Sequence, residues 1–170
     1  NGLSSNYQLS YSQEGNHSIA MNAAGDKMVI GSRQANRVFV YAWNGTSWDL
    51  EQNISGGYSY FGSSVDMNAA GDRIVVGAYN SNRAFTYSWN GSSWTQDANL
   101  SGSTYFGWDV SMSNGGDTIA ISEPYYNSQR GYVRTYAWNG SSWSQFGSTS
   151  TLGEGTSDYS GRSISLNGPG

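Results

Sequence analysis

The chain has 170 residues, of which 12% are charged and 15% aromatic, and its formal net charge is −4. This acidic balance argues against nucleic-acid binding, which needs a basic patch. No apolar run approaches the roughly 20 residues of a membrane span, so we also expect no membrane insertion.

Two short motifs recur along the chain at a spacing of about 46 residues. A motif of the type Asn-Ala-Ala-Gly-Asp occupies 22–26 and 68–72, and returns loosely at 113–117. A motif of the type Trp-Asn-Gly-Ser-Ser-Trp occupies 43–48, 89–94 and 138–143. A repeat of this length indicates one supersecondary unit used three times.

The middle unit contains four strand-like segments, at 64–68, 73–78, 83–89 and 94–100. The third alternates, with Phe85, Tyr87 and Trp89 on one face. Gly71-Asp72 and Asn90-Gly91 are turn signals, and Asn-Gly favours a type I′ hairpin with positive φ at both residues. No segment of the unit has a helical period.

Four short antiparallel strands in one unit are typical of a propeller blade. The sequence therefore predicts an all-β fold, a β-propeller segment of four-stranded antiparallel blades in a single array. We expect full repeats at about 16–61, 62–106 and 107–160, with partial blades at 1–15 and 161–170. These partial blades indicate a segment of a longer repeat protein.

The unit resembles the FG-GAP repeat of integrin α-type β-propellers. The resemblance rests on Phe61-Gly62 with Gly71–Ala78, and on Phe106-Gly107 in the next unit. The first unit has Gly15-Asn16 in place of Phe-Gly, and the third has Ser122-Glu123-Pro124 where the family has Gly-Ala-Pro. The resemblance implies the blade type and leaves the ligand open.

In that family, calcium often binds an Asp-x-Asp-x-Asp-Gly loop between blade strands. The corresponding loops here, 79–82 and 125–129, contain no Asp. A hard cation needs several oxygen ligands, carboxylates among them. We therefore expect no metal and no other cofactor.

The sequence does not predict an enzyme. Asp26, Asp72 and Asp117 recur, but Asp beside Gly in a tight turn usually bonds to its own backbone. Asp66 and Asp109 lie in first strands without recurring in every unit, and His17 is the only histidine. No clustered catalytic set accompanies any of them.

The paired tryptophans are the leading candidates for a ligand or assembly surface. They could present flat faces to a partner, or pack across the hairpin and hold its register. Six loop tyrosines are typical contact residues. Arg37, Arg83 and Arg130 precede the third strands; they could meet an anionic partner, although bridges to acids of the neighbouring blade are favoured. The tryptophans are Trp43, Trp48, Trp89, Trp94, Trp138 and Trp143, and the tyrosines are Tyr58, Tyr60, Tyr105, Tyr125, Tyr126 and Tyr159.

These features predict a non-enzymatic extracellular adhesion or recognition module at a cell or virion surface. The alternatives are a structural subunit of an extracellular filament or coat and a lectin-like sugar-binding propeller. The expected partner is a protein or glycan surface, or further copies of the chain. In a eukaryotic secreted protein, N-glycosylation would be possible at Asn16, Asn44, Asn53, Asn90, Asn99 and Asn139.

Overall fold

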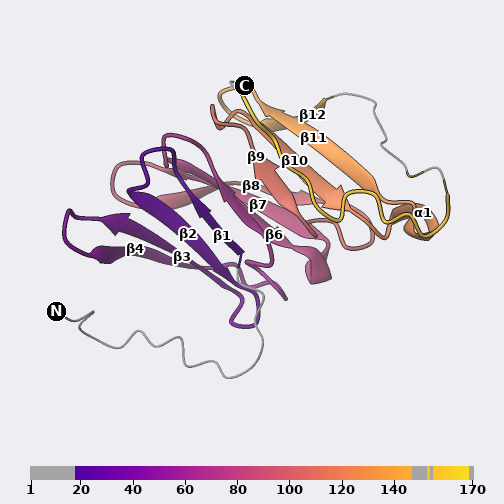
Figure 1. Cartoon of the computed structure of the whole chain (residues 1–170), viewed down its shortest axis with the longest axis horizontal. Coiled ribbons are helices and arrows are strands. Elements are labelled where there is room, and N and C mark those ends of the chain that lie inside the picture. Colours follow the sequence, from indigo (N-terminus) through magenta and orange to yellow (C-terminus); the bar gives the residue numbers. More distant parts are fainter. Residues whose placement is uncertain (1–17, 147–152, 154, 169–170) are drawn as a thin grey trace.

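The computed structural model describes residues 18–146, 153 and 155–168. Its strands form three consecutive four-stranded antiparallel sheets, called blades 1 to 3 (Figure 1). Blade 1 contains β1 (Ser18–Met21), β2 (Lys27–Ser32), β3 (Arg37–Trp43) and β4 (Trp48–Ser55). Blade 2 contains β5 (Val65–Met67), β6 (Arg73–Ala78), β7 (Arg83–Trp89) and β8 (Trp94–Ser101). Blade 3 contains β9 (Val110–Met112), β10 (Thr118–Glu123), β11 (Tyr132–Trp138) and β12 (Trp143–Phe146).

Helix is limited, in the described part of the chain, to η1 (Tyr79–Ser81) and α1 (Tyr126–Gln129). The predicted all-β propeller segment of four-stranded antiparallel blades is therefore confirmed. The strands of the middle unit also agree with the sequence pattern, because β6 and β7 have the predicted bounds. No described helix has the length and apolar character needed to cross a bilayer.

The core lies in the seams between blades. At the first seam, Val38 and Val40 of blade 1 belong to one buried cluster with Phe85 and Tyr87 of blade 2. At the second, Val75 and Ala84 of blade 2 cluster with the buried residues Ile119, Ile121 and Tyr136 of blade 3. The inner strands β6 and β7 of blade 2 are thus covered on both faces, which explains why β6 is continuously apolar.

Polar side chains of each innermost strand also bind the innermost strand of the next blade. Ser18 Oγ accepts the Val65 N–H at 2.9 Å, and Ser64 Oγ accepts the Val110 N–H at 3.2 Å. These bonds satisfy backbone donors at the inner edge of each sheet, where no further strand pairs with them.

Residues 161–168 continue this pattern on blade 3. The Ile164 N–H donates to Asp109 Oδ2 at 2.8 Å, and the Leu166 N–H donates to Ser111 Oγ at 3.0 Å. The segment therefore lies where the first strand of a following blade would lie, although it forms no strand. Residues 1–15 and the end of 161–170 fall outside the described residues, so the predicted repeat boundaries stay predictions.

The Asn-Gly hairpins are four-residue turns between cross-strand tryptophan pairs. In blade 2, the Asn90 side-chain oxygen accepts the N–H groups of Ser92 and Ser93 at 3.0 and 2.9 Å. Gly91 has a φ of 96°, whereas Asn90 does not have a positive φ. The expected type I′ turn is therefore wrong, because the asparagine stays in an ordinary conformation and caps the turn with its side chain.

Replacing Gly91 with valine is expected to lower the free energy of unfolding by about 1 kcal/mol. A Cβ at Gly91 would meet no atom within 4 Å, so the cost comes from the backbone conformation alone. Urea denaturation of Gly91→Val and Gly91→Asn measures it, since asparagine tolerates positive φ better than a β-branched residue does. Equal stability of the valine variant and the wild type would contradict the turn geometry.

Candidate functional site

The β2–β3, β4–β5, β6–β7, β8–β9 and β10–β11 loops gather at one end of the sheets, here called the belt end. Hydrogen bonds join these loops. The Tyr60 N–H donates to Asn36 Oδ1 at 2.6 Å, and the Tyr105 N–H donates to Asn82 Oδ1 at 2.7 Å. Asn80 Nδ2 likewise donates to Ser59 Oγ at 3.0 Å. The belt end is therefore a surface built from all three blades.

Six aromatic side chains form a continuous belt across this end. Successive ring centroids lie 5.4 Å apart for Tyr60 and Tyr79, 5.7 Å for Tyr79 and Tyr105, and 4.8 Å for Tyr105 and Tyr125. Trp108 lies 4.8 Å from Tyr79 and 5.4 Å from Tyr125. The aromatic belt consists of Tyr60, Tyr79, Tyr105, Trp108, Tyr125 and Tyr159.

The belt rings are partly accessible, and three of the six belt residues have a costly backbone conformation. Tyr60 is 37% exposed, and the other five are half-buried. Partial burial raises the pKa of Tyr79, with Arg33 acting in the opposite direction. Tyr60, Tyr105 and Tyr159 have φ values of 61°, 60° and 52°. Non-glycine residues in this region cost roughly 1 to 3 kcal/mol each and concentrate at functional sites.

Only part of the belt was found in the sequence. Tyr60, Tyr105, Tyr125 and Tyr159 were named as separate loop contacts, but Tyr79 and Trp108 were missed. The available signal was the recurrence of tyrosine two residues before Gly62, Gly107 and Gly161. The sequence could not show that η1 places Tyr79 between two of these positions.

Arginines flank the aromatic belt. Arg33 lies over the Tyr60 ring at 5.8 Å and Arg162 over the Tyr159 ring at 4.7 Å. Arg37 and Arg83, at the start of β3 and β7, donate to Asn53 and Asn99 of their own blades at 3.1 and 2.8 Å. The described residues place no carboxylate within ion-pair distance of these four arginines or of Arg130.

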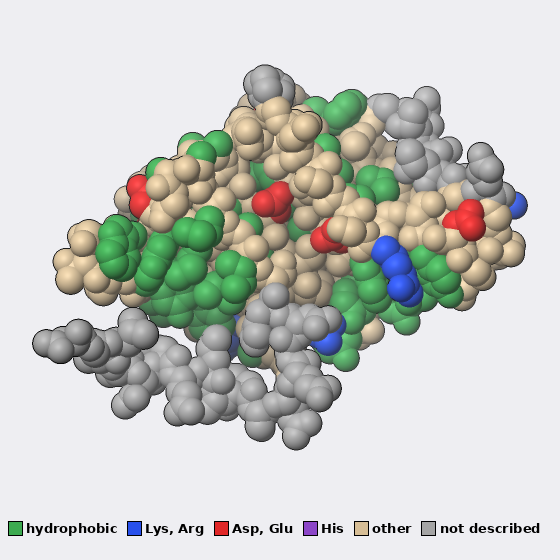
Figure 2. All heavy atoms as spheres, in the orientation of Figure 1, with side chains coloured by type: hydrophobic (Ala, Val, Ile, Leu, Met, Phe, Trp, Pro, Cys, Tyr) green, Lys and Arg blue, Asp and Glu red, His purple; other side chains and the backbone are tan. Residues whose placement is uncertain are grey.

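This arrangement corrects the favoured sequence interpretation, in which Arg37, Arg83 and Arg130 bridge to acids of neighbouring blades. Arg37 and Arg83 bind amide oxygens within their own blades instead. Five of the eight Lys and Arg residues thus lie at the belt end. Figure 2 shows Lys and Arg side chains beside hydrophobic ones along the lower edge of the molecule.

The carboxylates near the belt end are already engaged. Glu123 is fully buried; Oε1 forms an ion pair with Arg134 at 2.5 Å, and Oε2 accepts the Ser103 N–H at 2.6 Å. Burial opposes the charge of Arg134, but the bond to Glu123 outweighs it and raises the arginine pKa. Asp109 Oδ1 accepts the Ser64 hydroxyl at 2.7 Å, and Asp158 Oδ2 accepts the Gly155 N–H at 2.6 Å. Among the described residues at this end, only Glu123 is paired with a cation, whereas Asp109 and Asp158 accept bonds from neutral groups. The five arginines outnumber these two carboxylates, so basic side chains predominate at the belt end.

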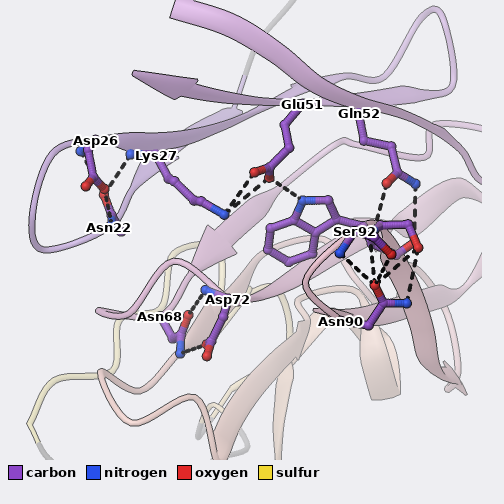
Figure 3. A network of polar contacts seen from close by, with 11 residues as sticks. Asn22, Asp26, Lys27, Glu51, Gln52, Asn68, Asp72, Asn90 and Ser92 are labelled. Atoms are coloured by element: carbon purple, nitrogen blue, oxygen red, sulfur yellow. Dashed lines mark hydrogen bonds and ion pairs between the residues drawn. The ribbon is translucent and has the colours of Figure 1, made fainter. Parts of the chain in front are cut away.

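The recurring Gly-Asp turns lie at the opposite end of the sheets and have a structural role. Asn68 Nδ2 donates to Asp72 Oδ1 at 2.7 Å, and Asn68 Oδ1 accepts the Asp72 and Arg73 N–H groups at 3.1 and 2.9 Å. Asn22 and Asp26 repeat the arrangement, with Asn22 Nδ2 donating to Asp26 Oδ1 at 2.7 Å (Figure 3). The asparagine, rather than the aspartate, therefore caps the turn.

Asp66 and Asp109 hold the seams together. Asp66 Oδ2 accepts the Met112 N–H at 2.7 Å and the Ser111 hydroxyl at 3.0 Å. Their side chains thus substitute for a β-ladder between neighbouring inner strands. The missed sequence signal was that a hydroxyl or carboxylate occupies 18, 64 and 109 in successive units.

The predicted tryptophan surface is divided between the seams and solvent. The pairs lie 5.6, 5.8 and 5.5 Å apart across Trp43–Trp48, Trp89–Trp94 and Trp138–Trp143. Trp94 and Trp143 are buried, so these two residues do not form part of an exposed ligand surface, contrary to the prediction. Trp43 is 43% exposed, and Trp48, Trp89 and Trp138 are half-buried.

Each blade supplies polar groups to the tryptophans of the next. Glu51 lies between Lys27 and the indole N–H of Trp94, which donates to Glu51 Oε2 at 2.7 Å (Figure 3). Gln52 Oε1 accepts the Trp94 backbone N–H at 2.7 Å. Lys27 lies 4.9 Å from the Trp89 ring, and Arg73 lies 4.7 Å from Trp138. Cross-seam packing accounts for the paired tryptophans at both internal seams.

The remaining predicted sites show no clustered chemistry. Asn44, Asn90 and Asn139 lie in exposed hairpins, and Asn53 and Asn99 are exposed on β4 and β8, so glycosylation there stays a prediction. Asn16 and His17 lie outside the described residues. Within the described ranges, no three His, Cys, Asp or Glu side chains are grouped to hold a metal ion. Burial raises the pKa of Tyr87 to about 12, and burial also raises that of Tyr136.

Comparison with known proteins identifies the architecture. The sequence matches no protein-family model and no curated protein. Its structure is similar to Saccharomyces cerevisiae Sqt1, with a TM-score of 0.62 and 14% identity over 82% of this chain and 38% of that chain. It is also similar to a proposed 6-phosphogluconolactonase from Bacteroides uniformis, with a TM-score of 0.60 and 12% identity over 77% of this chain and 40% of that chain.

A third similar structure is Kuenenia stuttgartiensis hydrazine synthase, with a TM-score of 0.58 and 13% identity over 79% of this chain and 38% of that one. The chain therefore spans about two fifths of the length of the solved structures that it resembles. At such low identity the likeness establishes the propeller-like fold alone.

The predicted function as an extracellular adhesion or recognition module is wrong. The similar structures include a proposed 6-phosphogluconolactonase, and none supports extracellular adhesion. The prediction inferred a biological role from the blade type, but one fold can serve many unrelated functions. The filament or coat subunit and the lectin-like propeller depended on the same step and are withdrawn with it.

Proposed function

We propose that the chain is a non-catalytic platform that binds an acidic, proline-containing protein segment along the aromatic belt. The observation that carries this proposal is the juxtaposition of the aromatic belt with five arginines that have no carboxylate partner among the described residues. Aromatic rings of Tyr and Trp receive prolines of extended segments. Arginines beside the rings add attraction for carboxylates.

The non-catalytic part of the proposal is supported by the titratable groups. The resolved pKa shifts, at Tyr79, Tyr87, Arg134 and Tyr136, are all upward and have burial or a structural ion pair as their cause. None brings a proton-transfer group toward neutral pH, where general acid–base catalysis works best.

The proposal extends to the blade type, which we infer to be FG-GAP-like. Phe61 and Phe106 are fully buried beneath Gly56 and Gly102. Gly62 and Gly107 both have a φ of 87°, and a Cβ there would lie 2.6 and 2.2 Å from the carbonyls of Arg37 and Arg83. The Phe-Gly pair thus has one structural role in two successive blades, as a repeat motif should.

Calorimetry on the whole chain can measure the binding of a 12-residue peptide of alternating Glu and Pro. We expect binding that weakens as salt is raised, because exposed charges are screened within about 10 Å at 0.1 M salt. Replacing both Arg33 and Arg162 with Gln should weaken the affinity by about tenfold, equivalent to about 1.4 kcal/mol. Lys27→Gln removes one positive charge at the opposite end; it serves as the control and should leave the affinity unchanged.

Two further ligands test whether the binding proposal fails. A Lys-Pro peptide of the same length should not bind. If the Glu-Pro peptide does not bind, or if the arginine and Lys27 variants behave alike, the belt is not its site. Tighter binding of a 12-nucleotide oligothymidine would replace the protein partner with single-stranded nucleic acid, which also combines cations with ring stacking.

A further inference from the structure

Blade 1 exposes residues that blades 2 and 3 bury. Ile19 of β1 is 59% exposed, whereas Val65 and Val110 at the same repeat position are 5% and 4% exposed. Met21 is 49% exposed, whereas Met67 and Met112 are 5% and 4% exposed. The difference does not come from residue type, because methionine occupies all three positions. It arises because blades 2 and 3 each pack against a preceding blade.

The same contrast extends to the outer part of the blade. Gly71 and Gly116 face Asn22 and Asn68 of the preceding blade, and a Cβ on either would lie within 2.9 Å of the asparagine amide. Gly25, their counterpart in blade 1, has no such neighbour within 4 Å. Trp43 and Leu50 are 43% and 42% exposed. Figure 2 shows hydrophobic side chains gathered at the blade 1 side of the molecule.

At the first internal seam every receiving group is paired, so this seam indicates what a fully matched covering blade supplies. There, blade 1 provides a cation over Trp89, a carboxylate to the Trp94 indole and a hydroxyl to the Val65 N–H. Lys27, Glu51 and Ser18 carry these groups. Because Trp43, Trp48 and Ile19 repeat the receiving positions, the open face has the same requirements.

The third blade of a second copy does not meet these requirements. At the position of Lys27 it has Thr118, and at the end of β12 it has Phe146 in place of an acid. Its acceptors Asp109 and Ser111 are already engaged by the N–H groups of Ile164 and Leu166. A head-to-tail contact between copies would therefore leave Trp43 without a cation and Trp48 without a carboxylate.

We propose that the open face of blade 1 docks a further propeller blade of the blade 1 type, carrying Lys or Arg over Trp43 and a Glu to Trp48. The occupant is a blade that lies outside residues 18–168 and differs in sequence from blade 3. This interface is independent of the belt end, since the two surfaces share none of the residues named here.

The test inserts a second copy of residues 18–63 between residues 17 and 18 of the full chain. The inserted copy carries Met21→Leu and Trp43→Phe, so that only the original blade 1 reports. Oxidation of Met21 by hydroxyl radicals, read by mass spectrometry, should slow by about tenfold, as expected if 49% exposure falls to the 5% of Met67. A matched insert that also carries Lys27→Thr and Glu51→Phe should give clearly weaker protection.

Four results would overturn the proposal. Unchanged Met21 oxidation would show that a blade of this type does not cover the face, and so would an insert that stays unfolded by circular dichroism. Equal protection by both inserts would remove the role of the charged groups. Sedimentation of the unextended chain as a dimer, with Met21 protected, would make a second copy the occupant.

Discussion

Gly77→Ala is expected to lower the free energy of unfolding by about 3 kcal/mol, the upper end of the usual cost of overpacking a core. A Cβ at Gly77 would lie 2.3 Å from the carbonyl oxygen of Gly107, a contact that real Cβ atoms do not make. The obstacle is backbone, so no side-chain rotation can relieve it. β6 of blade 2 and the loop that precedes β9 of blade 3 would have to separate.

The loop that carries Gly107 has little freedom to retreat. Its N–H donates to the Ser122 carbonyl at 3.1 Å, and its own Cα faces the carbonyl of Arg83. Because Gly107 has a φ of 87°, the loop already uses a conformation that side chains rarely adopt. The strain must therefore be spread over the seam, where Phe106 and Ile121 are fully buried.

Thermal and urea denaturation measure this effect, with two variants for comparison. Gly31→Ala should be equally costly, since its Cβ would lie 2.2 Å from the Gly62 oxygen. Gly155→Ala should be close to neutral, because its nearest neighbour is the side chain of Asp158 at 3.4 Å. A mild effect of Gly77→Ala, similar to that of Gly155→Ala, would mean that the blades approach less closely than described.

The blade was predictable from the sequence because its determinants are local. Alternation in 83–89 predicted β7, and the Trp-Asn-Gly hairpins predicted the direct pairing of Trp89 with Trp94. Gly31 and Gly77 are small residues near the ends of β2 and β6, and both approach the next blade closely. Each of these inferences needed only neighbours within one repeat.

The candidate site was less predictable because it depends on contacts between repeats. The aromatic belt joins Tyr60, Tyr79 and Tyr125 from three different loops, and no sequence spacing fixes their approach. Arg83 was expected to bind an acid across the seam, but it donates a hydrogen bond to Asn99 on the adjacent strand of its own blade instead. Single-residue differences at equivalent positions then change the seam chemistry from one blade to the next. Blade 3, for example, has Arg134 where blade 2 has Phe85.

The two internal seams differ at one such position. Trp94 Nε1 donates to Glu51 Oε2 at 2.7 Å across the first seam. At the second seam, Trp143 has the place of Trp94, and Asp97 at the bulge of β8 has the place of Glu51. Trp143 Nε1 and Asp97 Oδ2 are both buried, and neither has a hydrogen-bond partner among the described residues. Asp97 accepts the Ser88 hydroxyl through Oδ1 at 2.7 Å instead, and its side chain is one methylene shorter than that of a glutamate.

Asp97→Glu is therefore expected to raise the free energy of unfolding by about 1 kcal/mol, the usual net value of a hydrogen bond. Glu51→Ala should lower it by about 2 kcal/mol, since the buried Trp94 N–H loses its acceptor and Lys27 loses its ion pair. Urea denaturation followed by tryptophan fluorescence measures both changes. Asp97→Asn is the control: its side chain is no longer than that of aspartate, so it should not gain the bond. If Asp97→Glu destabilises the chain as much as Asp97→Asn does, the longer carboxylate is not reaching Trp143, and the second seam is closed by packing alone.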